Sequence, residues 1–524
     1  MNVTATVVFG ALFLLVTVLG FLASRWKQGN LDHLEEWGLG GRQFGTLITW
    51  FLLGGDLFTA FTVVAIPALA FGAGAMGMFA IPFCILTFPF IFMVFPRLWA
   101  IAKRHNYITV ADFVQARYRS NALTLVVAIT GILALMPYIA LQLVGLEVAI
   151  GALGFDTTGA GGDVPLAVAF AILAAYTWKS GLRAPAMIAI VKDILIYVTV
   201  IAAAIIIPAQ LGGFAHIFAA IPAPKLLLRS PNATSLNDYG VYVSIALGSA
   251  LSTVLYPHAA TALLSSKSGN TVRRNMALLP IYTLMLGFIT LLGYMAVAAG
   301  VKGMPEFARY FSAYGNNFAV PALFLHFFPS WLAGLAFAAI GIGALVPAAI
   351  MSIAAANLYT RNVHRALVNP RMTALDETRV SKLVAVFVKV GAVAIILGLP
   401  VSYATDLQLL GGVWIIQTLP TVVFGLFGRA FDPRGLLIGL LSGLACGTWM
   451  VVQLHFKTSV YPLHFGGYTV PLYSAIWALS FNIIIAGTLS VLAKLGGFAS
   501  PADLGLIADI RRDDNSAEKT MEGV

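Results

Sequence analysis

Charged residues are scarce in this chain. Only 10% of its 524 residues are charged, whereas 60% are hydrophobic, and the mean hydropathy is +0.90. A soluble globular protein typically has about a quarter of its residues charged, so this composition excludes that class. We interpret the sequence as an all-α polytopic membrane protein with the lipid bilayer as its solvent.

Cysteine is scarce as well. The chain has two cysteines, Cys84 and Cys446, and both lie inside apolar segments, which argues against a disulfide framework or a thiolate metal cluster. The sequence also lacks an HExxH motif, a glycine-rich phosphate loop and an appended soluble domain. We therefore expect no metal, no cofactor and no enzymatic activity, and the lack of a filter segment argues against a channel.

Basic residues exceed acidic ones and give a net charge of +10. In a soluble chain this value would suggest nucleic-acid binding, but here Lys and Arg lie in short loops between apolar runs. Sorting the loops alternately leaves most of these residues on one side, which the positive-inside rule makes cytoplasmic. We predict no nucleic-acid partner, a location in the cytoplasmic (inner) membrane, an N-terminus outside and a cytoplasmic tail over 500–524.

About thirteen apolar runs are long enough to span a bilayer, which takes roughly 20 residues. Their approximate extents are 4–24, 45–72, 76–101, 122–153, 164–178, 185–210, 240–265, 276–300, 331–358, 380–400, 405–428, 435–453 and 471–494. The first run has no basic segment before it and no clear cleavage site after it, so we interpret it as a retained span. The apolar piece from Ala319 to Phe328 is too short to cross and is predicted to form a helix in an outer loop.

Two spans contain helix interruptions. Gly54 and Gly55 precede Asp56 in the second run, and Gly248 and Pro257 lie in the seventh. Paired interruptions of this kind mark the binding site in many transporters, because freed amides and carbonyls at mid-membrane can hold a solute or an ion. The alternative is that these residues have no functional role, since Gly and Pro are more common in spanning helices than in soluble ones. The presence of interruptions in two corresponding spans favours a binding site.

A charged pair lies inside another span. The segment APAMIAIVKDILIYVTVIAAAIIIP, from Ala184 to Pro208, contains Lys192 and Asp193. A charge at hydrocarbon depth costs about 3 kcal/mol or more, so an intramembrane ion is a functional candidate. The alternative is a contact that only stabilises the helix bundle.

Six further segments are distinctive: LEEWGLGGRQFGTLITWFLLGGDLFTAFTVVAIPALAFGAGA, ITVADFVQARYRS, YTWKSGLRAPAMIAIVKDILIY, LYPHAATALLSSKSGNTVRRN, IGIGALVPAAIMSIAAANLYTRNVHR and GGVWIIQTLPTVVFGLF. Together they resemble the sodium/solute symporter family, in particular its bacterial monocarboxylate permease branch. The resemblance implies a thirteen-helix protein whose LeuT-like core consists of two inverted five-helix repeats, with broken helices in spans 2 and 7. The implied organisation is a first span and loop (1–44), repeat one (45–210), repeat two (240–430), two C-terminal spans (431–499) and a tail (500–524).

The resemblance also implies a sodium site that this chain does not preserve. In sodium-coupled members, backbone oxygens of the second span and a carbonyl and two hydroxyls of the ninth span hold Na⁺. Matching YTRNVH to the family's Thr-x-Asp-x-Tyr places the hydroxyls at Val346 and Pro347, which have no side-chain oxygen, and the carbonyls near Gly54, Leu57 and Gly343. A hard cation needs several oxygen ligands, so we predict a degenerate sodium site.

Lys192 is predicted to replace the ion. Relatives carry Trp-Thr-Asp where this chain has Val191, Lys192 and Asp193. Pro347 has no N–H and leaves the carbonyl of Gly343 without its helical donor, so we expect the ammonium to bind that carbonyl. Protonated Lys192 would join the moving bundle to the scaffold as the ion does, and deprotonation would release them.

The solute site is predicted between the broken second and seventh spans. Position matching gives hydrogen-bonding side chains among apolar walls, suited to a small carboxylate: Thr59, Ala60, Tyr138, Gln142, Ser249, Thr253, Pro257, His258, Trp414 and Gln417. For each of these residues an interhelical contact is an alternative role. His258 is also a candidate proton relay, and Asp56 a candidate for ion binding or for stabilising a helix end.

These patterns predict a secondary active transporter that imports short-chain monocarboxylates, such as lactate, pyruvate and alanine, together with protons by alternating access. Two alternatives stay open. One is Na⁺ coupling through Asp56, Asp193 and main-chain oxygens, and the other is a different solute, such as acetate or an amino acid.

Overall fold

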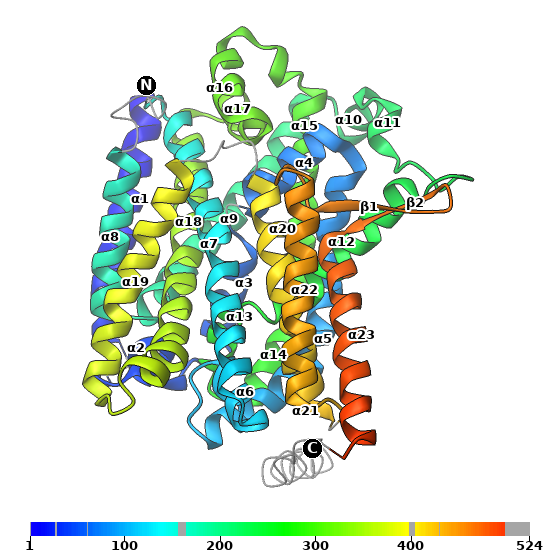
Figure 1. Ribbon diagram of the computed structural model, residues 1–524. Helices are drawn as coiled ribbons and strands as arrows, with labels where there is room; N and C mark the ends of the chain where they lie inside the picture. The colour runs from blue at the N-terminus through cyan, green and yellow to red at the C-terminus, as the bar shows by residue number, and fades with distance from the viewer. Residues whose placement is uncertain are drawn as a thin grey trace, which may run out of the picture.

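A computed structural model of the chain describes residues 2–26, 29–59, 61–155, 164–397, 404–428 and 430–497. Long helices run side by side through it (Figure 1). In this described part, nine helical segments are long and apolar enough to cross a membrane, or ten if one bent pair is a single span. Their main helices are α1 (Val3–Leu22), α5 (Ala80–Arg104), α7 (Asn121–Ala152), α9 (Arg183–Gln210), α15 (Pro280–Ala298), α18 (Ser330–Leu358), α20 (Ala404–Ile415), α22 (Pro433–Gln453) and α23 (Ser474–Leu495).

The other helices of the bundle are shorter, bent or less apolar. They are α3 (Thr46–Leu57), α4 (Ile66–Ala73), α8 (Val164–Ser180), α12 (Asn237–Thr253), α13 (Pro257–Leu264), α14 (Gly269–Leu278) and α19 (Ala374–Leu397). Each apolar run predicted above contains one or two helices from these two sets. The predicted architecture of long apolar helices is thus confirmed, whereas the number of thirteen spans stays a prediction.

Small elements cover the ends of the bundle. The short helices α10 (Phe214–Ala220), α11 (Ala223–Leu226), α16 (Ala308–Tyr314) and α17 (Ala319–Phe327) lie at the end where α1 begins, and α2 (Leu34–Leu39) and α6 (Val110–Tyr118) lie at the end where α23 finishes (Figure 1). The short helix expected over Ala319–Phe328 is confirmed as α17.

A β-hairpin precedes the last helix and was not predicted. Strands β1 (Val460–Phe465) and β2 (Tyr468–Tyr473) pair antiparallel, with Val460 opposite Tyr473. Gly466 and Gly467 form the two-residue turn, and both have positive φ angles, as a type I′ turn requires. The apolar run predicted to begin at residue 471 therefore begins as a strand, and the helix starts at Ser474.

Two helices are broken in the spans where breaks were predicted, although the positions differ. The second-span helix α3 continues through both Gly54 and Gly55 and ends at Leu57. The chain resumes as a π-helical turn over Phe61–Ala65. In the seventh span, α12 and α13 are bent by 48° at a break just before Pro257. The break in the second span therefore follows Leu57 and not the two glycines.

Helix α18 forms the centre of the core. Its most apolar stretch is entirely buried inside the protein. Small residues in this helix let neighbouring backbones approach it. A Cβ atom on Gly334 would lie 2.4 Å from the carbonyl oxygen of Ala5 in α1. In a membrane, where helix association depends on van der Waals packing, such small residues fix the contacts between helices.

The α22–α23 contact offers a test of this packing. A Cβ atom on Gly439 would lie 2.7 Å from Cβ of Ala486 and 2.8 Å from the carbonyl oxygen of Asn482. We expect Gly439→Leu to destabilise the protein by about 1–3 kcal/mol through overpacking, and thermal unfolding in detergent measures this. Gly10→Leu is the matched control, because nothing lies within 4 Å of a Cβ atom there. Equal melting temperatures for the two variants would contradict the prediction.

Candidate functional site

Lys192 lies where α9 meets the end of α3. Its side chain is fully buried, and Nζ donates hydrogen bonds to the carbonyls of Gly55 and Phe58, the latter at 2.8 Å. The last carbonyls of a helix have no intrahelical donor, and α3 ends at Leu57. The ammonium therefore supplies donors that the break in the helix removes.

Asp193 completes a buried ion pair. Its Oδ1 lies 3.1 Å from Nζ of Lys192, and its Oδ2 accepts a 2.7 Å hydrogen bond from the hydroxyl of Tyr282 in α15. The rings of Phe58 and Trp50 lie 4.6 and 4.7 Å from the ring of Tyr282. A buried ion pair depends on partners for its remaining hydrogen-bonding capacity. Here the two carbonyls accept from the ammonium and Tyr282 donates to Oδ2, while Oδ1 has only its ion-pair contact with Lys192.

The adjacent glycines of α3 make room for these groups. A Cβ atom on Gly54 would lie 2.0 Å from Cζ of Tyr282, and one on Gly55 would lie 3.0 Å from Nζ of Lys192. Close approach of side chains to the helix, rather than interruption of the helix, explains both glycines.

The second-span carbonyls differ from the predicted ones. The carbonyl of Gly54 accepts a 2.9 Å hydrogen bond from the N–H of Phe58, and the carbonyl of Leu57 accepts one from the hydroxyl of Thr62. The ammonium binds Gly55 and Phe58, one residue further along in each case. Both acceptors lie at the end of α3, which continues past the two glycines to Leu57.

The predicted hydrogen bond from Lys192 to Gly343 is not present either. Among the described residues, both hydrogen bonds of the ammonium go to the second span. Gly343 is nevertheless close, since a Cβ atom there would lie 3.9 Å from the carbonyl oxygen of Phe58. Helix α18 thus lies beside the Lys192 site, but its Gly343 carbonyl accepts no hydrogen bond from the ammonium.

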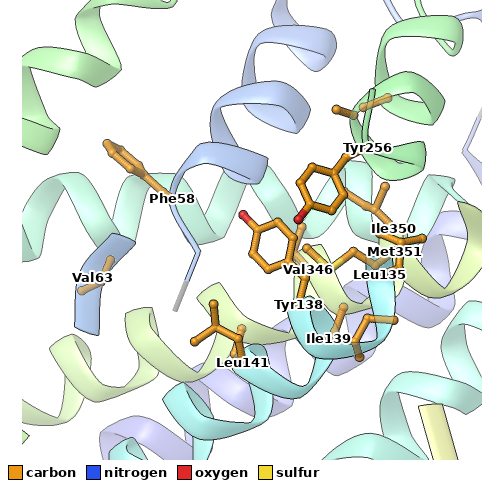
Figure 2. Packing of buried hydrophobic residues seen from close by; sticks show 14 of the residues in the cluster. Phe58, Val63, Leu135, Tyr138, Ile139, Leu141, Tyr256, Val346, Ile350 and Met351 are labelled. Carbon is orange, nitrogen blue, oxygen red and sulfur yellow. The ribbon is translucent and has the colours of Figure 1, made fainter. Parts of the chain in front are cut away.

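The two positions of the missing sodium hydroxyls lie in the apolar core. Val346 and Pro347 are both buried in α18, and Figure 2 shows Val346 among buried hydrophobic residues that include Tyr138 and Ile350. Neither side chain contains an oxygen, so α18 offers no side-chain ligand at these positions.

A second group of predicted residues lines one cavity at the end of α3. Asp56, at the end of α3, and His258, in the first turn of α13, face each other, with Oδ2 and Nε2 3.4 Å apart. Tyr138 of α7 and Thr253 of α12 also line this cavity. Four residues selected from distant parts of the sequence are therefore brought together.

Several lining residues were not predicted, and they include three with polar or thiol groups. Tyr256, Gln408 and Cys84 line the same cavity, and the hydroxyl of Tyr256 donates to the carbonyl of Gln408 at 3.2 Å. The ring of Tyr256 lies 5.4 Å from that of Tyr138 and 5.2 Å from that of His258. Figure 2 shows the two tyrosines next to each other. Tyr256 stands beside Pro257 in YPHAAT, and Gln408 is one of two glutamines in an apolar run, so both had a usable signal.

Three of the predicted solute residues are buried nearby but do not line this cavity. Thr59 follows the end of α3, Gln142 donates to the carbonyl of Tyr138 at 3.3 Å, and Ser249 lies inside α12. Ala60 lies outside the described residues. Pro257 lines a separate small cavity that also includes Thr109 and Thr418 and lies toward the end of the bundle occupied by α6.

Trp414 and Gln417 are directed toward the C-terminal helices. The indole N–H of Trp414 donates to the hydroxyl of Thr448 in α22 at 3.1 Å, and Asn482 of α23 donates to Oε1 of Gln417 at 3.2 Å. The structure therefore does not bring these two residues to the cavity, because α22 and α23 pack against this face of the eleventh span.

Comparisons with known proteins agree with this architecture. A sequence model of the Sodium:solute symporter family matches residues 37–443. The monocarboxylate transport permease protein of Rhizobium johnstonii is 50% identical over 496 residues, covering 94% of this chain and 97% of that protein. The uncharacterized symporter YodF of Bacillus subtilis is 32% identical over 99% of both chains.

A solved structure of a Na⁺-coupled sialic acid symporter, in a substrate-bound outward-open state, superimposes with a TM-score of 0.76. It covers 95% of this chain and 99% of that one. At 13% sequence identity this similarity concerns the fold alone.

Proposed function

This chain belongs to the sodium:solute symporter family, and from that premise we propose that it imports short-chain monocarboxylates together with protons. It is a multi-pass membrane transporter of small solutes and not an enzyme. Lactate and pyruvate are the proposed solutes, with alanine as a further candidate. The relative from Rhizobium, half identical over nearly the whole chain and called a monocarboxylate transport permease, supports this class.

Proton coupling rests on one observation, the contact of Lys192 with the broken second span. The ammonium donates to carbonyls at the end of α3, where sodium-coupled relatives are expected to bind their ion, and α18 has carbon-only side chains at Val346 and Pro347. A protonated lysine supplies the same positive charge to those carbonyls as Na⁺ would.

The proposed mechanism follows from what this contact joins. Protonated Lys192 holds α9 to α3 and pairs with Asp193; loss of the proton removes the attraction and frees the two helices to move. The cavity of Asp56 and His258 uses the same broken segment of α3 as its wall, so solute binding and proton binding act on one element. We also propose that the protein has thirteen spans with two inverted repeats. Its N-terminus lies outside the cell in this proposal, and its location is the inner membrane.

Uptake into proteoliposomes tests the coupling ion. Purified protein is reconstituted and given labelled lactate or pyruvate under an imposed proton gradient or an imposed Na⁺ gradient, each alone. We expect accumulation with the proton gradient. Accumulation with the Na⁺ gradient only would overturn proton coupling and favour an ion site made by Asp56, Asp193 and main-chain oxygens.

Cys84 provides a reporter for the solute cavity. It lines the cavity with Asp56 and His258, and the chain has only one other cysteine, Cys446. In a Cys446→Ser variant, lactate is expected to slow the reaction of Cys84 with a small thiol reagent severalfold, because the solute occupies the space beside the thiol. Labelling of Cys446 in a Cys84→Ser variant is the control and should not respond. An unchanged Cys84 rate at saturating lactate would place the solute elsewhere.

A further inference from the structure

The Asp56–His258 pair closes one side of the solute cavity. Oδ2 of Asp56 and Nε2 of His258 lie 3.4 Å apart, and the two side chains are 9% and 3% exposed. The pair joins the two broken spans, because Asp56 is the penultimate residue of α3 and His258 the second residue of α13.

Both members of the pair have an unused polar atom. Oδ1 of Asp56 and Nδ1 of His258 are buried and have no hydrogen-bond partner among the described residues. The carboxylate opposite Nε2 fixes the proton of a neutral imidazole on Nε2, which leaves Nδ1 as a bare acceptor. With an ionised Asp56 and a neutral imidazole, the pair therefore has two acceptor atoms without donors and one negative charge.

Among the described residues, no other charged side chain lines the cavity. Its other titratable lining groups are Tyr138 from α7, Tyr256 before α13 and Cys84 from α5, while Gln408 and the residues from α4 and α15 are neutral. Lys192 does not line the cavity: its ammonium donates to the carbonyl of Gly55, although it interacts electrostatically with the neighbouring Asp56. Its charge is already paired with Asp193.

A monocarboxylate that enters this cavity meets a carboxylate and a lone pair. Two carboxylates that share a buried site cannot both stay ionised without a proton or another cation between them. One proton taken from the aqueous side onto Nδ1 of His258 resolves the conflict. The imidazolium then donates Nε2–H to Asp56 and Nδ1–H to the solute carboxylate, and no other bond is made or broken.

We propose that the Asp56–His258 pair takes up one proton when a short monocarboxylate binds, and so forms a second protonation site separate from Lys192. This inference rests on the proposed function, because the charge of the solute drives the proton uptake. The aromatic rings of Tyr138 and Tyr256, 5.3 and 5.2 Å from the imidazole, shield the pair from water and strengthen the coupling between proton and solute. The proton enters and leaves with the solute.

Calorimetry of lactate binding tests this inference. Titrations of purified full-length protein in buffers with different ionisation enthalpies give the number of protons taken up per bound lactate. We expect about one proton for the wild-type protein and none for the double variant Asp56→Asn/His258→Gln, which keeps similar side-chain volumes and removes both titratable groups. The single variants should lie between these values.

Two further variants separate the possible outcomes. Lys389→Met, in helix α19, which contributes no lining residue to the cavity, should bind lactate with the same proton uptake as the wild-type protein. Lys192→Met should lose proton-driven transport but keep proton uptake on binding. Loss of proton uptake in Lys192→Met together with its persistence in the double variant would overturn the inference and assign the proton to Lys192.

Lactate that binds the wild-type protein without proton uptake would also overturn the inference while leaving monocarboxylate transport intact. Failure of lactate and pyruvate to bind at all would overturn the proposed function as well. The melting curve shows whether the double variant folds. If it does not, the single variant His258→Gln provides the test. A His258→Gln variant that still takes up one proton and binds lactate with unchanged affinity would contradict a role for the imidazole.

Discussion

Lys192→Met is expected to reduce proton-driven accumulation of lactate in proteoliposomes at least tenfold, roughly the effect of 1.4 kcal/mol. Methionine has a similar length but no N–H, so the carbonyls of Gly55 and Phe58 lose their donor. Each unsatisfied buried polar group costs about 1–3 kcal/mol, and Asp193 loses its positive partner. The contact between α9 and the end of α3 that we assign to the proton is then gone.

Lys389→Met is the matched control for this experiment. Lys389 is also a buried lysine in a bundle helix, 3% exposed. Its ammonium donates to the carbonyl of Ala385 one turn earlier in the same helix, at 3.3 Å, so it joins no two helices. Uptake by Lys389→Met should stay close to that of the wild-type protein. If Lys192→Met also retained gradient-driven uptake, Lys192 would be structural and proton coupling would need another residue.

The sequence predicted those parts of the fold that depend on local composition. Long apolar runs identify the helices because lipid leaves no other way to satisfy the backbone of a spanning segment. The presence of Lys192 and Asp193 in one of these runs was enough to predict a buried, partnered pair. The spans that contain the breaks were predicted correctly for the same kind of reason, from Gly and Pro within the runs.

Features that depend on packing between distant segments were not predictable in this way. Gly54 and Gly55 have the composition of a helix break, but they accommodate Tyr282 and Lys192 within an intact helix. Tyr282 itself, 89 residues from Asp193, gave no signal as its partner. Position matching also selected Trp414, whose orientation is set by α22 and therefore by a part of the chain outside the two predicted repeats.

Replacement of Asp193 by Asn is expected to destabilise the protein by about 3–5 kcal/mol, the usual cost of removing one member of a buried ion pair. Asparagine has nearly the same volume as aspartate, so the loss reports charge rather than packing. The ammonium of Lys192 must then either stay charged without a counter-ion or lose its proton, and both states are less favourable than the pair. Thermal unfolding in detergent measures the loss, and proton-driven uptake of lactate should fall with it.

Asp238→Asn is the control, because Asp238 pairs with Arg229 at the protein surface, where the Arg229 side chain is 79% exposed; an exposed pair contributes at most about 1 kcal/mol. The decisive comparison is the double variant Lys192→Met/Asp193→Asn. Residues that act as one pair give non-additive losses, so the double variant should lose about 1–3 kcal/mol less than the sum of the two single variants. Additive losses would mean that the two charges do not stabilise each other, and the lysine would then hold the broken helix through its carbonyl hydrogen bonds alone.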